Sequence, residues 1–160
     1  AGKGSSEEVQ KAAIDGLTKL STFAKDFDIN IIVENHGGFS SNGKWLNKAI
    51  SSVGMDNCGT LPDFGNFCIK NGKSGCEEEY DRYQGMKELM PFAKGVSAKS
   101  HDFDAEGNET KTDFRKMLSI VKKAKFSGFF GIEYEGSALS EIEGIKATKK
   151  LLEKIREEYS

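Results

Sequence analysis

Four short apolar runs in this chain end on a side chain that can bind a metal ion. They end at Glu34, Asp63, His101 and Glu133, at separations of 29, 38 and 32 residues. A strand-helix-strand unit occupies roughly 30 residues or more, so the spacing matches one strand and one helix per repeat. Strands repeated in this way lie parallel, and their carboxyl ends emerge on the side of the sheet where α/β barrels hold their active sites.

Apolar periodicity predicts an α/β fold that opens with a helix and continues as four strand-helix units. The predicted strands cover 29–34, 58–63, 95–101 and 129–134, and the helices cover about 6–26, 42–53, 77–90, 112 onward and 138–158. Ser40 or Ser41 is the expected cap of the second helix. Nothing in the composition divides the chain, so a single domain over residues 1–160 is expected.

Charge and composition exclude several classes of partner. The net charge is −2 and the pI is about 5.8, so no basic field exists to attract nucleic acid. No apolar run approaches the roughly 20 residues that cross a bilayer, and the first residues lack the apolar core of a signal peptide. We expect neither a nucleic-acid partner nor a membrane partner.

The cysteines Cys58, Cys68 and Cys76 are odd in number and contain no C-x-x-C pair. This argues against a structural zinc site and against a disulfide framework. We interpret the three as reduced thiols, which favours a reducing compartment such as the cytoplasm.

Three carboxylates and an imidazole at one edge of a sheet would form a site for a divalent cation. Taken alone, Glu34 is also consistent with a solvated loop residue and Asp63 with an Asx turn. Glu133 ends a very apolar strand, where an unpaired carboxylate is costly. The coincidence of four such positions favours the metal interpretation.

Further polar residues fall on the same predicted edge. Lys99 and His101 share strand parity, so we expect both to face the cavity, one binding metal and the other contacting substrate. Glu135 has the parity of Glu133, and His36 follows the first strand. Four aromatic residues in the loops above are candidates for stacking on a sugar or for a lid: Phe39, Phe64, Phe67 and Phe103.

Four segments make the chain resemble the xylose isomerase-like TIM barrels, a superfamily of sugar isomerases and epimerases that also contains endonuclease IV. The segments are Val33–His36, Pro62–Asn66, Ala98–Asp102 and Gly131–Gly136. The resemblance implies that Glu34, Asp63, His101 and Glu133 bind Mn²⁺, Mg²⁺, Co²⁺ or Zn²⁺.

The activity that this resemblance implies is isomerisation or epimerisation of a sugar, sugar phosphate or polyol through a metal-stabilised enediolate. Glu34 and Glu133 would carry the proton. The expected substrate-binding residues are His36, Asn66, Lys99 and Glu135.

The chain departs from the family pattern at three positions. Ser40 stands where the ketose epimerases have a second glutamate, and Asn66 stands where they have a histidine. If Asp102 matches the acid of the family's His-x-Lys-Asp motif, Lys99 rather than His101 occupies the metal-histidine position. The alternatives are therefore an enediolate lyase or dehydratase, an endonuclease IV-like phosphodiesterase, and a non-catalytic carbohydrate-binding relative.

The family barrel has eight strands and this sequence predicts four, which correspond to the carboxyl-terminal half. An open half-barrel leaves strands 29–34 and 129–134 as unpaired edges. We therefore expect either self-association or a missing amino-terminal half of the barrel.

Overall fold

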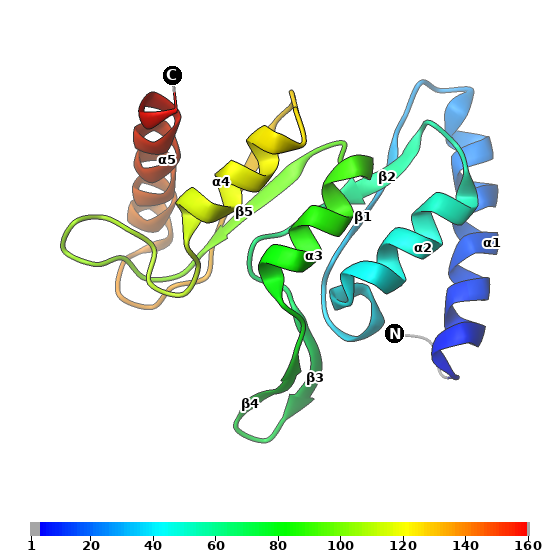
Figure 1. Cartoon of the computed structure of the whole chain (residues 1–160), viewed down its shortest axis with the longest axis horizontal. Helices are drawn as coiled ribbons and strands as arrows, with labels where there is room; N and C mark the ends of the chain where they lie inside the picture. The colour runs from blue at the N-terminus through cyan, green and yellow to red at the C-terminus, as the bar shows by residue number, and fades with distance from the viewer. Residues whose placement is uncertain (1–3, 160) are drawn as a thin grey trace.

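Over residues 4–159, which the computed structural model describes, the chain forms five α-helices, four parallel strands and one antiparallel hairpin (Figure 1). The helices are α1 (Ser6–Lys25), α2 (Gly43–Val53), α3 (Arg82–Leu89), α4 (Phe114–Lys123) and α5 (Glu141–Glu158). The parallel strands are β1 (Ile31–Glu34), β2 (Cys58–Leu61), β5 (Val96–Ser100) and β6 (Phe130–Tyr134). The hairpin consists of β3 (Cys68–Gly72) and β4 (Gly75–Glu79). The predicted α/β arrangement is confirmed.

The parallel strands lie in the order β1-β2-β5-β6. Strands β1 and β2 form one ladder and β5 and β6 form another, while single bridges at Thr60–Ala93 and Asp63–Ser97 join the two ladders. In the second ladder Lys99 is the register partner of Glu133. Among the described residues β1 and β6 each pair along one side only, so the sheet is an open arc and not a closed barrel.

Local hydrogen bonds fix where the helices begin. Ser5 forms a capping box with Glu8 at α1, and Ser140 forms one with Glu143 at α5. The cap of α2 is Asn42, so the expectation of Ser40 or Ser41 was wrong. Those two serines lie in a 3₁₀ turn (Gly38–Ser41), where their hydroxyls accept the backbone amides of residues 36 and 37.

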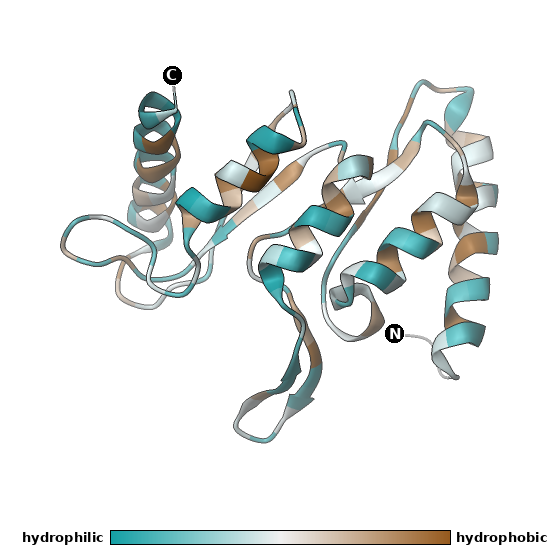
Figure 2. Cartoon of the chain, in the orientation of Figure 1, coloured by the Kyte–Doolittle hydropathy of each residue, from teal (hydrophilic) through white to brown (hydrophobic). Residues whose placement is uncertain are grey.

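The apolar core lies between the sheet and the helices. One cluster packs β5 and β6 against α3, α4 and α5 around Phe64, Val96 and Met117. A second cluster packs β1 and β2 against α1 and α2 around Leu46 and Ile50. In Figure 2 hydrophobic residues colour β1 and a stripe of α4, β5 is mixed, and β4 is largely hydrophilic. Side chains alternate along a strand, so those that point away from the helices face the inside of the arc, as Lys99 and Glu133 do.

The hairpin corrects two sequence expectations. Glu77–Glu79 lie in the exposed strand β4 and not in the first turn of a helix, and α3 begins only after the cap residue Asp81. Cys68 and Cys76 form a disulfide across the hairpin, so the expectation that they are reduced was wrong, and the compartment inferred from it loses its basis. Cys58 is a buried free thiol.

Both ends of the arc expose apolar side chains. Phe23 and Phe27 lie beside the β1 end, and Phe129 and Ile142 lie beside the β6 end. Phe129 is 90% exposed, which is unusual for a phenylalanine that leads into a strand. Association through these ends stays a prediction. No helix within residues 4–159 has both the length and the apolar character needed to cross a membrane.

Candidate metal centre

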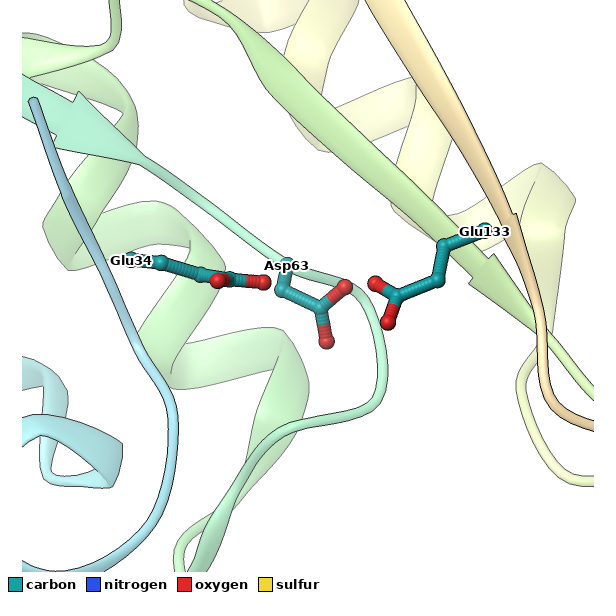
Figure 3. A group of neighbouring side chains, drawn as sticks. All are labelled: Glu34, Asp63 and Glu133. Atoms are coloured by element: carbon teal, nitrogen blue, oxygen red, sulfur yellow. The ribbon is translucent and has the colours of Figure 1, made fainter.

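Glu34, Asp63 and Glu133 converge at the carboxyl ends of the parallel strands. One carboxylate oxygen from each of the three lies within 4.8 Å of the others. In Figure 3 Asp63 lies between the two glutamates, whose carboxylates point toward it from opposite sides. The cause is the shared register of the strands: Glu34 ends β1, Asp63 follows β2, and Glu133 lies on β6 opposite Lys99.

Asp63 is the buried member of this group. Its Oδ1 accepts the amides of Gly65 and Asn66, at 2.9 Å and 2.7 Å, which forms the Asx turn that the sequence allowed. Its Oδ2 is buried and has no hydrogen-bond partner among the described residues. Burial raises the pKa of Asp63 to about 6, although the nearby Ser97 hydroxyl, the turn amides and the Lys99 charge all act to lower it.

Lys99 reaches into the same group from β5. Its side chain is 2% exposed, and its ammonium lies 3.3 Å from Glu133 Oε1, 3.1 Å from Glu135 Oε1 and 3.0 Å from Asn66 Oδ1. Burial alone would lower the pKa of Lys99. The hydrogen bond to Glu135 and the charges of Asp63, Glu133 and Glu135 together raise it, so the ammonium is charged at neutral pH.

Three residues that the sequence interpretation did not assign to the site hold it in shape. Asn35 is fully buried; it accepts the Asp63 amide at 2.7 Å and donates to the carbonyls of Asp63 and Asn66. Ser97 donates to Glu133 Oε2 at 3.3 Å. Gly65 leaves room for the stem of Lys99, because a Cβ there would lie 2.9 Å from Lys99 Cδ.

Sequence signals for these residues exist but are weak. Asn35 directly follows an apolar strand, Ser97 has the strand parity of Lys99, and Gly65 follows Asp63 by two residues. Each pattern is common in proteins without such a site, so only the contacts give it meaning.

His101 does not lie in the carboxylate group. Strand β5 ends at Ser100, and beyond that point the alternation of side chains no longer applies. The backbone amide of His101 donates to Glu109, and its Nδ1 lies 3.7 Å from the same carboxylate. Burial and the charge of Lys111 lower the pKa of His101. The charges of Glu135 and Lys99 also act on the pKa of His101, so the imidazole lies near the group without belonging to it. Its expected role as a metal ligand stays a prediction.

The expected substrate-binding residues are only partly brought together. Asn66 bridges the group, since its amide nitrogen lies 3.5 Å from Glu34 Oε1 while its oxygen accepts from Lys99. Glu135 contacts the Lys99 ammonium and is exposed. His36 is exposed in the loop after β1 and is not part of the group.

The loop aromatic residues mostly serve packing. Phe64 and Phe67 are fully buried in the core, which corrects their expected place above the site. Phe39 stacks on Trp45 with ring centroids 5.7 Å apart, and Phe103 stacks on Tyr134 at 6.4 Å. These rings are already paired within the chain.

Comparison with solved structures gives the same fold in several sugar epimerases. An L-ribulose 3-epimerase matches with a TM-score of 0.72 at 14% identity, covering 99% of this chain and 59% of that one. A D-tagatose 3-epimerase-like protein matches with a TM-score of 0.68 at 20% identity, covering 96% and 58%. A 3-keto-D-glucoside 4-epimerase from E. coli matches with a TM-score of 0.69 at 14% identity, covering 96% and 57%.

This chain therefore spans less than two thirds of the length of these proteins, and the low identities establish the fold alone. Comparison with curated protein sequences gives no match. The family model of the xylose isomerase-like TIM barrel matches residues 1–158, which is nearly the whole chain. The chain belongs to the xylose isomerase-like TIM barrel family.

Proposed function

We propose that this chain carries the catalytic half of a sugar, sugar-phosphate or polyol isomerase or epimerase that moves a proton at a carbon beside a carbonyl. The supporting observation is the placement of Glu34 and Glu133 on opposite sides of Asp63 at the carboxyl ends of the strands. An epimerase removes a proton from one face of a carbon and returns it to the other. Two carboxylates that approach from β1 and β6 suit this two-base chemistry.

A divalent cation fits the site. Glu34, Asp63 and Glu133 supply three oxygen ligands within 4.8 Å of one another, and the buried Asp63 Oδ2 lacks a partner among the described residues. We propose that these three residues would hold the ion. When bound, a divalent ion polarises the substrate carbonyl as a Lewis acid. Carboxylate ligands without an imidazole favour Mn²⁺ or Mg²⁺ over Zn²⁺.

The other polar residues orient the substrate and the two bases in this proposal. Asn66 contacts both Glu34 and Lys99, so it keeps the β1 base aligned with the β5–β6 side of the site. Ser97 and Lys99 contact the two oxygens of Glu133 and fix its direction. Glu135 and the exposed His36 lie nearer to solvent, where a sugar hydroxyl would contact them.

The phosphodiesterase alternative receives less support, because a multi-metal cluster uses several histidines and neither His36 nor His101 lies in the carboxylate group. A lyase or dehydratase would begin with the same proton removal. Product analysis separates these reactions, since a lyase or dehydratase changes the carbon skeleton or releases water.

The test is solvent deuterium exchange at the carbon beside the carbonyl, measured by NMR with the chain, Mn²⁺, and a panel of ketoses and inososes. The Glu34→Gln and Glu133→Gln variants each lose a base and an ion ligand, so exchange should fall in both, by about 10²-fold or more from the epimer whose proton that carboxylate removes. Glu79→Gln on the exposed hairpin is the control and should leave exchange unchanged. The proposal would be contradicted if both site variants still exchange both epimers, or if the original chain exchanges none of the sugars in the panel.

A further inference from the structure

Strand β5 directs Ser97 and Lys99 toward the group, and neither is a carboxylate. Strands β1 and β6 and the segment after β2 each direct one acidic side chain into the group, namely Glu34, Glu133 and Asp63. Strand β5 lies between β2 and β6, and it directs Lys99 into the group. A lysine ammonium has no lone pair, so β5 supplies a positive charge instead of a fourth metal ligand.

The ammonium is held by a complete set of acceptors. It donates a hydrogen bond to Asn66 at 3.0 Å and forms ion pairs with Glu135 at 3.1 Å and Glu133 at 3.3 Å, so three oxygens surround its three N–H groups. The stem lies against Gly65, where any side chain would collide with it. Lys99 is therefore held in a buried pocket by several contacts, unlike a surface lysine that forms a single ion pair.

The ammonium and a divalent ion would use the same carboxylate. Glu133 contacts Lys99 through Oε1 and belongs to the three-residue group that would hold the metal. Two positive charges a few ångströms apart in a partly buried site repel each other strongly. The ion would also have to draw Glu133 away from its ion pair with Lys99 and from the hydrogen bond that Ser97 donates to it.

We propose that Lys99 is a resident cation of this site, which takes the place of a fourth metal ligand and weakens divalent binding by competing for Glu133. The Lys99 ammonium then supplies part of the positive charge that a metal ion would otherwise provide to a substrate oxygen. This inference rests on the proposed position of the metal, and it adds that the ion is held loosely by three carboxylates beside a fixed ammonium.

The experiment is a calorimetric Mn²⁺ titration of the 160-residue chain at neutral pH, which needs no substrate. Lys99→Met removes the charge and should bind Mn²⁺ at least about tenfold more tightly than the original chain. Lys99→His removes the charge and adds a ligand, so it should bind more tightly still. Lys99→Arg keeps the charge and should bind no more tightly than the original.

Lys70→Met is the matched control, because Lys70 is an exposed lysine paired with Glu77 on the hairpin. It makes the same change in net charge far from the site and should leave Mn²⁺ affinity unchanged. Equal tightening in Lys70→Met and Lys99→Met, or no tightening in either Lys99→Met or Lys99→His, would overturn the proposal.

Removing a buried ammonium leaves the carboxylates repelling one another, so thermal unfolding with and without Mn²⁺ is the second measurement. The Lys99→Met chain should be destabilised alone and recover with Mn²⁺. A Lys99→Met or Lys99→His chain that stays unfolded at saturating Mn²⁺ would also overturn the proposal, because the ion would then be unable to replace the ammonium. If the titrations give the expected result but no sugar shows deuterium exchange, the proposed reaction is rejected and the role of Lys99 stands.

Discussion

The two sides of the carboxylate group are held by different forces. On the β1–β2 side, Asp63 is fully buried and fixed by backbone amides and by the neutral side chain of Asn35. On the β5–β6 side, Glu133 is 40% exposed and fixed by Ser97 and the charged Lys99. The first side is therefore set by directional hydrogen bonds in a dry environment. The second depends on charge balance, which salt, pH and bound ions can alter.

The largest expected effect comes from breaking the neutral side. Asn35→Ala removes three hydrogen bonds and leaves the amide and the carbonyl of Asp63 without this partner, while the Asn66 carbonyl keeps the Ser41 hydroxyl. We expect a loss of about 3 kcal/mol in the free energy of unfolding, measured by urea denaturation. Asn57→Ala, just before β2, also removes bonds to two carbonyls but in a half-buried setting, and should cost about 1 kcal/mol. Equal losses in the two variants would remove the distinction drawn between the sides.

The pH dependence of stability tests whether burial or nearby positive charge dominates the pKa of Asp63. Its pKa is raised to about 6, so between about pH 4 and pH 6 the folded state binds a proton that the unfolded state has released. Its contribution to stability therefore falls as pH rises through this window. Relative to the original chain, Asp63→Asn should gain about 2 kcal/mol on going from pH 4 to pH 7, measured by urea unfolding at each pH.

Glu158→Gln is the control for this series. Its hydrogen bond to Arg115 lowers the pKa of Glu158, so its contribution is present at neutral pH and is lost as pH falls. The variant should therefore change the pH slope in the opposite direction. Parallel stability curves for Asp63→Asn and the original chain would show that burial does not dominate at Asp63.

The smallest expected effect sharpens the description of the charged side. Gly65→Ala places a methyl group 2.9 Å from the stem of Lys99, which has to shift and lengthen its contacts with the glutamates. We expect a loss of about 1 kcal/mol, because a flexible side chain yields more easily than backbone. Gly131→Ala on β6 meets nothing closer than 3.8 Å and should be nearly neutral. A neutral result at both positions would mean that the lysine is not tightly held.

Much of this architecture follows from the sequence because short-range signals determine it. The apolar runs before Glu34 and Glu133 predicted strands, and Ser5 with Glu8 and Ser140 with Glu143 formed the capping boxes that begin two helices. The convergence of three carboxylates followed from strand period alone. The alternation of side chains along the third predicted strand also placed Lys99 in the cavity, and β5 is a regular strand through that residue.

The errors arose where a local rule was extended beyond its element. Parity alone cannot place His101, because the strand ends one residue earlier and Glu109 accepts its backbone amide. Glu77–Glu79 have the composition of a helix start, yet the turn at residues 72–75 pairs them with β3 instead. The disulfide depended on that same turn, since a spacing of eight residues brings Cys68 and Cys76 together only within a hairpin.

Phe67 anchors the chain between the hairpin and the carboxylate group. Its ring is fully buried against α3, so close to Gly85 that no side chain would fit there, and its carbonyl accepts the Tyr80 amide at the base of the hairpin. Asn66 precedes this residue and Cys68 follows it. The buried ring of Phe67 thus anchors the chain between the exposed hairpin and Asn66, so a displacement of the hairpin tip would leave Asn66 in its position between Glu34 and Lys99.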